Sequence, residues 1–209
     1  MKKIIFLIIF VISYTNAQTY SFDYKIKFVN YKKNKNDLQD CFYFVNSQNP
    51  NYSMYLYHNK NGAIRDCDKN ICNVHKFEYM QNYEFNKYRF INSFQYEVKD
   101  EITITKIIVE KIDDNKYTIK CFENESSKKT NLELTVILKP ENSDLVRFYY
   151  LDLSYNIQQK LIRSLKEKLN GNYNYIIEDY IVNYRQGVKR HYKIDNLEKI
   201  DLKIINANN

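Results

Sequence analysis

The sequence predicts a mainly β (α+β) fold, in which a strongly curved antiparallel sheet or half-barrel packs against one helix in the C-terminal half. Three observations predict it. Segments of alternating apolar and polar residues recur along the chain, while only one segment repeats its apolar residues at helical spacing. The chain also contains 21 tyrosines, whose rings can fill a wide interior while their hydroxyls reach water. A sandwich or a closed barrel would fit the same pattern.

The first seventeen residues have the pattern of an export signal. Lys2 and Lys3 precede the apolar run Ile4–Ile12, and the segment ends in the tripeptide TNA, a pattern that signal peptidases cut. The apolar run is too short to span a bilayer, which takes about 20 residues. We therefore expect cleavage after Ala17, no transmembrane segment after cleavage, and a periplasmic or secreted single β-rich domain over residues 18–209.

The net charge gives no sign of a nucleic-acid partner. It is +7 for the whole chain, and removal of two lysines with the signal segment lowers it to +5. Basic residues are scattered among acidic ones, and export separates the chain from nucleic acid. We therefore expect no nucleic-acid partner.

Alternation predicts strands through the first two thirds of the chain. The first, Thr19–Phe28, places tyrosine, phenylalanine and isoleucine on one face and mainly charged residues on the other. The strands Cys41–Ser47 and Tyr52–His58 flank a turn at Pro50. Further predicted strands are Phe94–Asp100, Glu101–Ile112, Lys116–Phe122, Leu132–Leu138 and Val146–Leu153.

The one predicted helix occupies residues 155–170. Ser154 or Asn156 can cap its start, and Gly171 stands where the chain must leave it. Its apolar residues recur at helical spacing, at Ile157, Leu161, Ile162, Leu165 and Leu169. Three more strands are predicted after it, with a tight turn before the second, at Tyr173–Tyr184, Lys189–Ile194 and Leu197–Ile205.

The stretch RDCDKNICNVH, Arg65–His75, is the one cluster that resembles a chemical site. As a zinc site it lacks the second pair of ligands that usual spacings supply. As a calcium loop it has Ile71 where glycine is needed and Phe77 where the last glutamate should stand. A catalytic thiol would need protection from oxidation after export. We therefore expect neither a metal nor another cofactor.

Disulfides are the simplest interpretation of four cysteines in an oxidising compartment. Three pairings are possible, and unpaired buried thiols are the alternative. We favour Cys67–Cys72 across a hairpin loop. For the second bridge we favour Cys41–Cys121 between strands, because both residues fall on predicted inward faces.

The sequence shows no catalytic constellation. The histidines His58, His75 and His191 have no nucleophile and orienting acid in a known pattern. The three glycines form no hydrolase or nucleotide-binding signature. We therefore expect no catalytic residues and a protein that is not an enzyme.

The densest basic stretch is VKRHYK. Alternation places Lys189, His191 and Lys193 outward, where they could contact an anionic surface or a lipid headgroup. The alternative is a solvated edge strand that lysines protect from aggregation.

Three stretches, NAQTYSFDYKIKF, YFVNSQNPNYSMYLY and HYKIDNLEKIDLKI, carry a resemblance. In texture and strand order they resemble exported β-rich proteins of the Bacteroidota, especially flavobacterial ones, and more distantly LolA-like half-barrels, which carry lipoproteins or lipids between membranes. The GLPGLI signature of another exported group is missing. The resemblance implies a periplasmic or secreted, non-enzymatic protein and assigns no functional residue.

Two functions follow as expectations, with a dispersed-site secreted hydrolase as a third. The first is an envelope binding protein for an apolar or lipid-like ligand, and a roomy apolar cavity beneath the helix would support it. The second is a structural or protein-interaction module of the periplasm or cell surface, with a filled core and an envelope protein as partner.

Overall fold

The computed structural model describes residues 18–32, 35–37, 41–57, 60–69, 71–81, 86–185 and 187–206. The expected export signal, residues 1–17, and His58 lie outside these ranges. Most of the described chain is strand, with a single helix, as the sequence predicted. No helix in the described ranges is long and apolar enough to cross a membrane.

The strands form one antiparallel sheet. Their bounds are β1 (Gln18–Lys32), β2 (Lys35–Asp37), β3 (Cys41–Val45), β4 (Tyr52–Tyr57), β5 (Asn61–Asp68), β6 (Ile71–Gln81), β7 (Asn86–Glu97), β8 (Lys106–Asp113), β9 (Lys116–Phe122), β10 (Leu132–Pro140), β11 (Tyr175–Tyr184) and β12 (Lys189–Asn206). Their order in the sheet is β7-β6-β5-β4-β3-β1-β12-β11-β10-β9-β8, and β2 pairs with β1 off this path.

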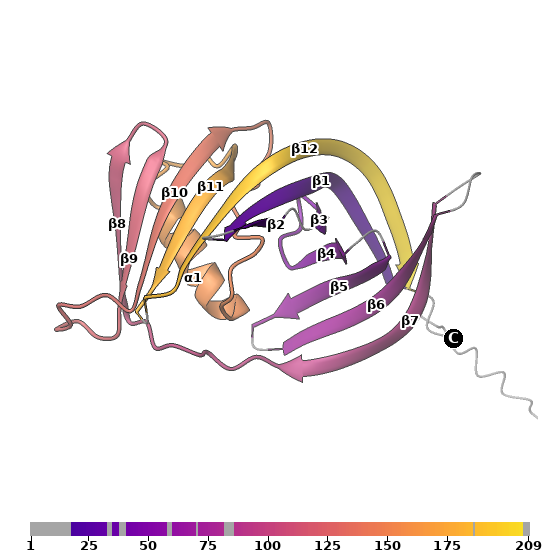
Figure 1. Cartoon of the computed structure of the whole chain (residues 1–209), viewed down its shortest axis with the longest axis horizontal. Helices are drawn as coiled ribbons and strands as arrows, with labels where there is room; N and C mark the ends of the chain where they lie inside the picture. The colour runs from indigo at the N-terminus through magenta and orange to yellow at the C-terminus, as the bar shows by residue number, and fades with distance from the viewer. Residues whose placement is uncertain are drawn as a thin grey trace, which may run out of the picture.

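The sheet curves strongly and stays open (Figure 1). The strands β7 and β8, which follow each other in the chain, are its two edges, and residues 98–105 connect them across the opening. The predicted curved sheet is confirmed, and a closed barrel is excluded. The predicted strand Glu101–Ile112 begins only at Lys106, because its first residues belong to this connection.

The long strands β1 and β12 join the two halves of the sheet and arch over its interior (Figure 1). Their pairing register shifts between Phe22 and Tyr24 and again between Lys27 and Phe28, and such bulges bend a strand. The sequence predicted two strands where the structure has the single strand β12. The polar residues between the two predicted segments do not form a turn, because Asn196 stays paired with Lys27.

The half of the sheet that contains β3 to β6 has an aromatic core on one face only. There the side chains of these strands pack against the first residues of β1 and the last residues of β12. The buried members of this core are Tyr20, Phe22, Phe44, Met54, Leu56, Ile64, Phe77 and Ile204. Because side chains alternate along a strand, the intervening residues of β3 to β5 point to the opposite face.

The helix α1 (Tyr155–Lys166) packs against the other half, on strands β8 to β11. The Ser154 hydroxyl caps it by accepting a hydrogen bond from the Ile157 N–H at 3.3 Å. After the helix, Asn170 and Gly171 turn the chain with positive φ angles. The predicted helix is confirmed, although it ends at Lys166 and residues 167–170 continue as turns. Its buried side chains, Ile157, Leu161, Ile162 and Leu165, complete a solid core.

The segment before the helix is not the strand that the sequence predicted at Val146–Leu153. Residues 145–154, here called the inner segment, are irregular apart from one bridge between Leu145 and Ile176. Val146, Phe148, Tyr149 and Leu151 are all buried, so the segment is enclosed by protein instead of presenting one wet face. This burial explains why its apolar residues resemble a strand without forming one.

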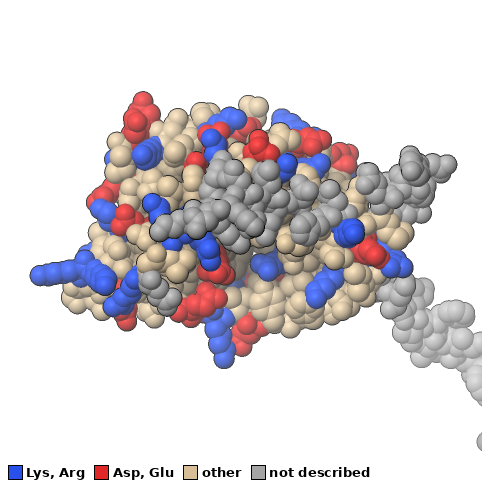
Figure 2. All heavy atoms as spheres, viewed as in Figure 1, with Lys and Arg blue, Asp and Glu red and all other residues tan. Residues whose placement is uncertain are grey.

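The charges on the surface are mixed, as the sequence indicated. Figure 2 shows lysines and arginines interspersed with aspartates and glutamates over this face of the molecule, with no block of one sign. Several of the opposite charges form exposed ion pairs, such as Lys120–Glu110 at 2.7 Å. Pairs of this kind contribute little to stability.

Candidate ligand-binding cavity

The cluster Arg65–His75 forms the β5–β6 hairpin, and its two cysteines are joined. Cys67 and Cys72 are register partners and form a disulfide, with their Cα atoms 4.1 Å apart. The predicted bridge is therefore confirmed. Among the described residues, no group of three or more His, Cys, Asp or Glu side chains is placed to hold a metal ion.

The second predicted bridge, Cys41–Cys121, is wrong: both residues are free thiols. Cys41 lies on β3 and Cys121 on β9, and four strands separate β3 from β9 in the sheet. Both side chains are buried, but burial did not bring their strands together. Burial raises the pKa of Cys41 to about 11 and that of Cys121 to about 12.

The basic stretch lies at the start of β12. His191 is half-buried, and its Nε2 lies 2.8 Å from a carboxylate oxygen of Asp179 on β11. Lys189 and Lys193 are exposed. Contact of these three residues with an anionic surface stays a prediction. Between them, Arg190 is also exposed and lines a cavity, a position that was not predicted from the sequence.

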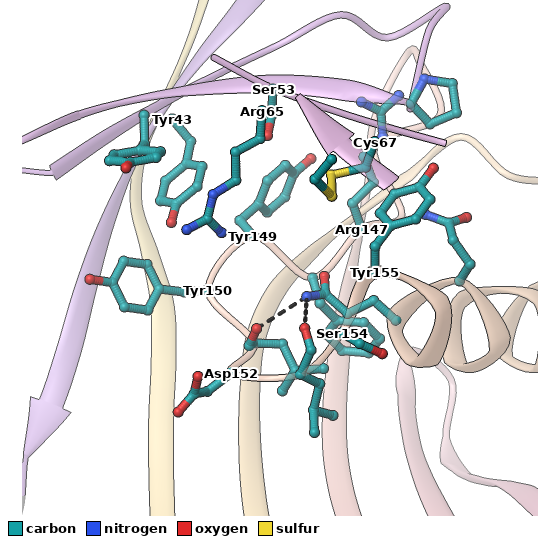
Figure 3. Close-up of a pocket in the computed structure, with 18 of the residues that line it drawn as sticks. Tyr43, Ser53, Arg65, Cys67, Arg147, Tyr149, Tyr150, Asp152, Ser154 and Tyr155 are labelled. Carbon is teal, nitrogen blue, oxygen red and sulfur yellow. Dashed lines mark hydrogen bonds between the residues drawn. A yellow bond between two sulfur atoms is a disulfide. The ribbon is translucent and has the colours of Figure 1, made fainter. Parts of the chain in front are cut away.

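This cavity has a volume of about 730 Å³ and lies beside the start of α1 rather than beneath the helix (Figure 3). One wall is the face of β3 to β5 opposite the aromatic core, and the other is the inner segment. The charged groups that line it are Arg65, Arg147, Arg190, Glu101 and Asp152. Tyrosine is the commonest lining residue, with Tyr43, Tyr52, Tyr55, Tyr57, Tyr96, Tyr149, Tyr150, Tyr155 and Tyr192.

The sheet wall follows from the strand register. Tyr43 on β3 lies opposite Tyr55 on β4, and in the next row Ser53 lies between Val45 and Arg65. Side chains opposite each other, or two residues apart on one strand, share a face. Figure 3 shows Tyr43, Ser53 and Arg65 pointing from the sheet toward the inner segment.

The opposite wall is fixed by hydrogen bonds to main-chain carbonyls. The Tyr149 hydroxyl donates to the Leu145 carbonyl at 3.1 Å. From the first turns of α1, Gln158 Nε2 donates to the carbonyls of Leu151 and Leu153 at 3.1 and 2.8 Å, drawn as dashed lines in Figure 3. These side-chain hydrogen bonds satisfy main-chain carbonyls that a β-strand would have paired with a neighbouring strand.

The connection between the sheet edges borders the cavity through Glu101. Burial raises the pKa of the Glu101 carboxyl, and the charges of Asp152 and Asp100 raise it further. Asp100 also accepts a hydrogen bond from the Ser154 hydroxyl, the same group that caps α1. The connection is thus tied to the helix that follows the inner segment.

A chain of tyrosine rings crosses the cavity from the sheet to β12. The ring centroids of Tyr55 and Tyr43 are 6.5 Å apart, those of Tyr43 and Tyr150 5.8 Å, and those of Tyr150 and Tyr192 5.4 Å. Tyr192 stacks on Tyr180 at 5.0 Å. Ring contacts of this kind stabilise a wall beyond the area that they bury.

The tyrosine hydroxyls remain protonated hydrogen-bond donors. Burial is the main cause that raises the pKa of Tyr43 well above its usual 10, and it likewise raises that of Tyr150. It raises the pKa of Tyr192 to about 12. Within the described ranges, the hydroxyls of Tyr43, Tyr55 and Tyr150 make no hydrogen bond, so they are available to a molecule in the cavity.

Two arginines of the cavity differ in their surroundings. Arg65 places its guanidinium carbon 5.4 Å from the Tyr55 ring centroid, and among the described residues it forms no ion pair or hydrogen bond. Arg147 Nη2 donates weakly to the Ser47 carbonyl at 3.4 Å, while its Nη1 is buried without a hydrogen-bond partner in the described structure. A buried unsatisfied donor is uncommon in folded proteins.

None of these cavity residues was predicted from the sequence to bind a ligand. Cys41, Cys67 and Cys72 were interpreted as structural cysteines and Ser154 as a helix cap. One usable signal was present. In CFYFV and YSMYLY, tyrosines occupy alternate positions while phenylalanine, methionine and leucine occupy the others. A strand with one face of purely apolar side chains and another face of tyrosines is typical of a strand that is covered on both sides, with water reaching the tyrosine side.

Comparisons with protein-family models, with curated proteins and with solved structures find no match for this chain. The resemblance to exported Bacteroidota proteins and LolA-like half-barrels therefore stays a prediction.

Proposed function

We propose that the protein is a non-enzymatic binding protein that holds one small, lipid-like amphiphilic molecule. The observation that carries the proposal is the cavity of about 730 Å³ between the sheet and the inner segment. Its size lies within the range of small-molecule sites, roughly 300–1,000 Å³. The helix fills one half of the concave side of the sheet, and the cavity lies in the other half.

The lining supports an amphiphilic ligand better than a purely apolar one. Tyrosine presents a flat apolar ring and a polar tip, so a wall of tyrosines accepts both hydrocarbon and hydrogen-bonding groups. The binding hypothesis from the sequence involved a roomy apolar cavity beneath the helix. The observed lining is more polar than that, because it contains many tyrosine hydroxyls and three arginine guanidinium groups. The ligand is therefore proposed to carry a polar end.

The lining also favours binding over catalysis. It includes no histidine among the described residues, and the Ser154 hydroxyl is occupied by Asp100 and by the helix N-terminus. The buried thiol Cys41 is held in its neutral, weakly nucleophilic form by its raised pKa.

We place the protein outside the cytoplasm, in the periplasm or among secreted proteins. The expected signal segment and the Cys67–Cys72 disulfide both support this location, because disulfides persist in oxidising compartments.

Native mass spectrometry tests the proposal. We expect a one-to-one adduct with dodecanoate or dodecan-1-ol that disappears on denaturation. Ser53→Trp places a large ring in the cavity and should abolish the adduct, whereas Ser126→Trp on an exposed loop should keep it. Failure to bind either probe, or equal binding by Ser53→Trp, would contradict the proposal.

A second candidate function is interaction with an envelope protein through the edge strand β7. Ile91, Phe94 and Tyr96 are exposed there, and the rings of Phe94 and Tyr96 lie 6.3 Å apart. A photo-crosslinking residue in place of Phe94 should capture one partner in the exported fraction. The same residue in place of Glu110, exposed near the other edge, should not.

A further inference from the structure

We infer that the cavity selects a ligand with a single carboxylate, and that Arg65, together with the hydroxyls of Tyr43 and Tyr150, binds that carboxylate. The inference rests on the proposed function and adds the chemical class of the ligand and the residues that recognise it.

Arg65 is available for an anion. Its side chain extends from β5 into the cavity, and Figure 3 shows its guanidinium in the space bordered by Tyr43, Tyr149 and Tyr150. Among the described residues, it contacts the face of the Tyr55 ring, which leaves the edge of the guanidinium fork open. A planar guanidinium edge matches a carboxylate through two parallel hydrogen bonds.

Among the described residues, no carboxylate forms an ion pair or hydrogen bond with Arg65. After burial, the groups that most affect the pKa of Tyr43 are Cys41, Tyr150, Arg65 and Tyr55, none of which carries a negative charge at neutral pH. The same holds at Tyr150, where Tyr57 is the additional group. Of the charged groups named for these two tyrosines, Arg65 is the one that lowers their pKa.

Arg147 has a different setting, although it lines the same cavity. Around Tyr149 its charge is opposed by Asp144 and Asp23, and around Tyr155 by Asp68 and Asp66. Its guanidinium already donates to the Ser47 carbonyl. Arg147 thus has one guanidinium nitrogen engaged within the protein and acidic residues in its surroundings, so we assign the ligand anion to Arg65.

The charge of the whole lining favours a monoanion. Three arginines and two carboxylates line the cavity, several of them at its exposed border, which gives a formal charge of +1 when both acids are ionised. One carboxylate balances this charge. A phosphate dianion would exceed it and would lie in the same cavity as Glu101 and Asp152.

The tyrosines supply the neutral donors. The hydroxyls of Tyr43 and Tyr150 are free to donate to a carboxylate, because among the described residues neither makes a hydrogen bond. Each such donor is expected to contribute about two- to tenfold in affinity, whereas loss of the charged donor should cost about tenfold or more. The apolar remainder of the ligand would contact the tyrosine rings.

Isothermal titration calorimetry with three twelve-carbon probes tests the inference. The purified protein is titrated at pH 7.5 with dodecanoate, dodecan-1-ol and dodecyl phosphate below the concentrations at which they aggregate. We expect dodecanoate to bind most tightly. Arg65→Gln should weaken dodecanoate by about tenfold or more and leave dodecan-1-ol unchanged, and Arg163→Gln, on the exposed face of α1, is the matched control.

The outcomes separate the inference from the proposed function. If no probe binds, the proposed function fails. If dodecanoate and dodecan-1-ol bind equally and Arg65→Gln changes neither, the cavity binds ligands but the carboxylate inference is wrong. Tighter binding of dodecyl phosphate would overturn the choice of a monocarboxylate, and a larger loss in Arg147→Gln than in Arg65→Gln would overturn the assignment to Arg65. Tyr43→Phe and Tyr150→Phe should each weaken dodecanoate but not dodecan-1-ol.

Discussion

The face to which a side chain points decides its chemistry in this protein. On β3, Tyr43 borders the cavity and keeps a free hydroxyl, whereas its neighbour Phe44 is buried in the aromatic core on the other side. On β5, Ile64 and Arg65 divide in the same way. A shift of one residue in register would bring the arginine into the aromatic core, so the pairing that fixes the fold also fixes the cavity.

The two free thiols give a prediction at the scale of single residues. Because burial raises the pKa of Cys41 to about 11 and of Cys121 to about 12, we expect neither to react with iodoacetamide in the folded protein at pH 8. After denaturation without reductant, both should react. Intact mass spectrometry before and after denaturation counts the two additions, and an addition to the folded protein would contradict the buried placement.

The raised pKa values of the same two thiols make the stability of the fold depend on pH. A thiol whose pKa is higher in the folded state than in the unfolded state stabilises the fold below its unfolded pKa, near 9. As the pH rises above that value, the unfolded chain loses protons that the folded protein retains. This contribution to the free energy of unfolding therefore declines between about pH 9 and the folded pKa values.

Among the elements, the β5–β6 hairpin gives the clearest prediction. Its disulfide closes a loop of only a few residues, for which chain entropy predicts a stabilisation of about 2 kcal/mol. The double variant Cys67→Ala/Cys72→Ala should lose about this much in urea unfolding, with an unchanged dependence on urea concentration. Dithiothreitol should lower the stability of the original protein to a similar level but leave the double variant unaffected. If the urea midpoint of the original protein were the same with and without dithiothreitol, this prediction would be wrong.

The elements also show what local pattern can predict. The helix α1 and the strands β1, β3, β4, β9, β10 and β11 follow from spacing alone, because each has one buried face and one wetter face. Pattern failed at Val146–Leu153, where the inner segment is enclosed by both halves of the molecule. It also missed β5, β6 and the start of β7, whose residues vary in polarity because the faces of these strands meet a core, a cavity and solvent in turn.

At the scale of the whole molecule, the cavity depends on contacts between distant parts of the chain. Arg65 and Tyr43 come from the first third of the sequence, Tyr150 from the inner segment and Tyr192 from β12. No spacing rule connects them, since they meet only when the sheet curves and the inner segment enters its concave side. The fold class was therefore predictable from the sequence, whereas the site was not. The pairing Cys41–Cys121 failed for the same reason, because two inward residues can belong to different halves of one curved sheet.

Hydrogen exchange tests this division into halves. In an open sheet the edge strands β7 and β8 have amides with no partner strand, and they should exchange faster than those of the central strands β1, β12 and β10. Addition of dodecanoate should slow exchange in β3 to β5 and in the inner segment, where local openings of the cavity walls expose amides. It should leave the edge strand β8 unchanged, because exchange there needs no opening of the cavity. Equal protection of β7 and β8 with the central strands would mean that the edges are paired and the sheet closed, and uniform slowing by dodecanoate would mean that the cavity does not open locally.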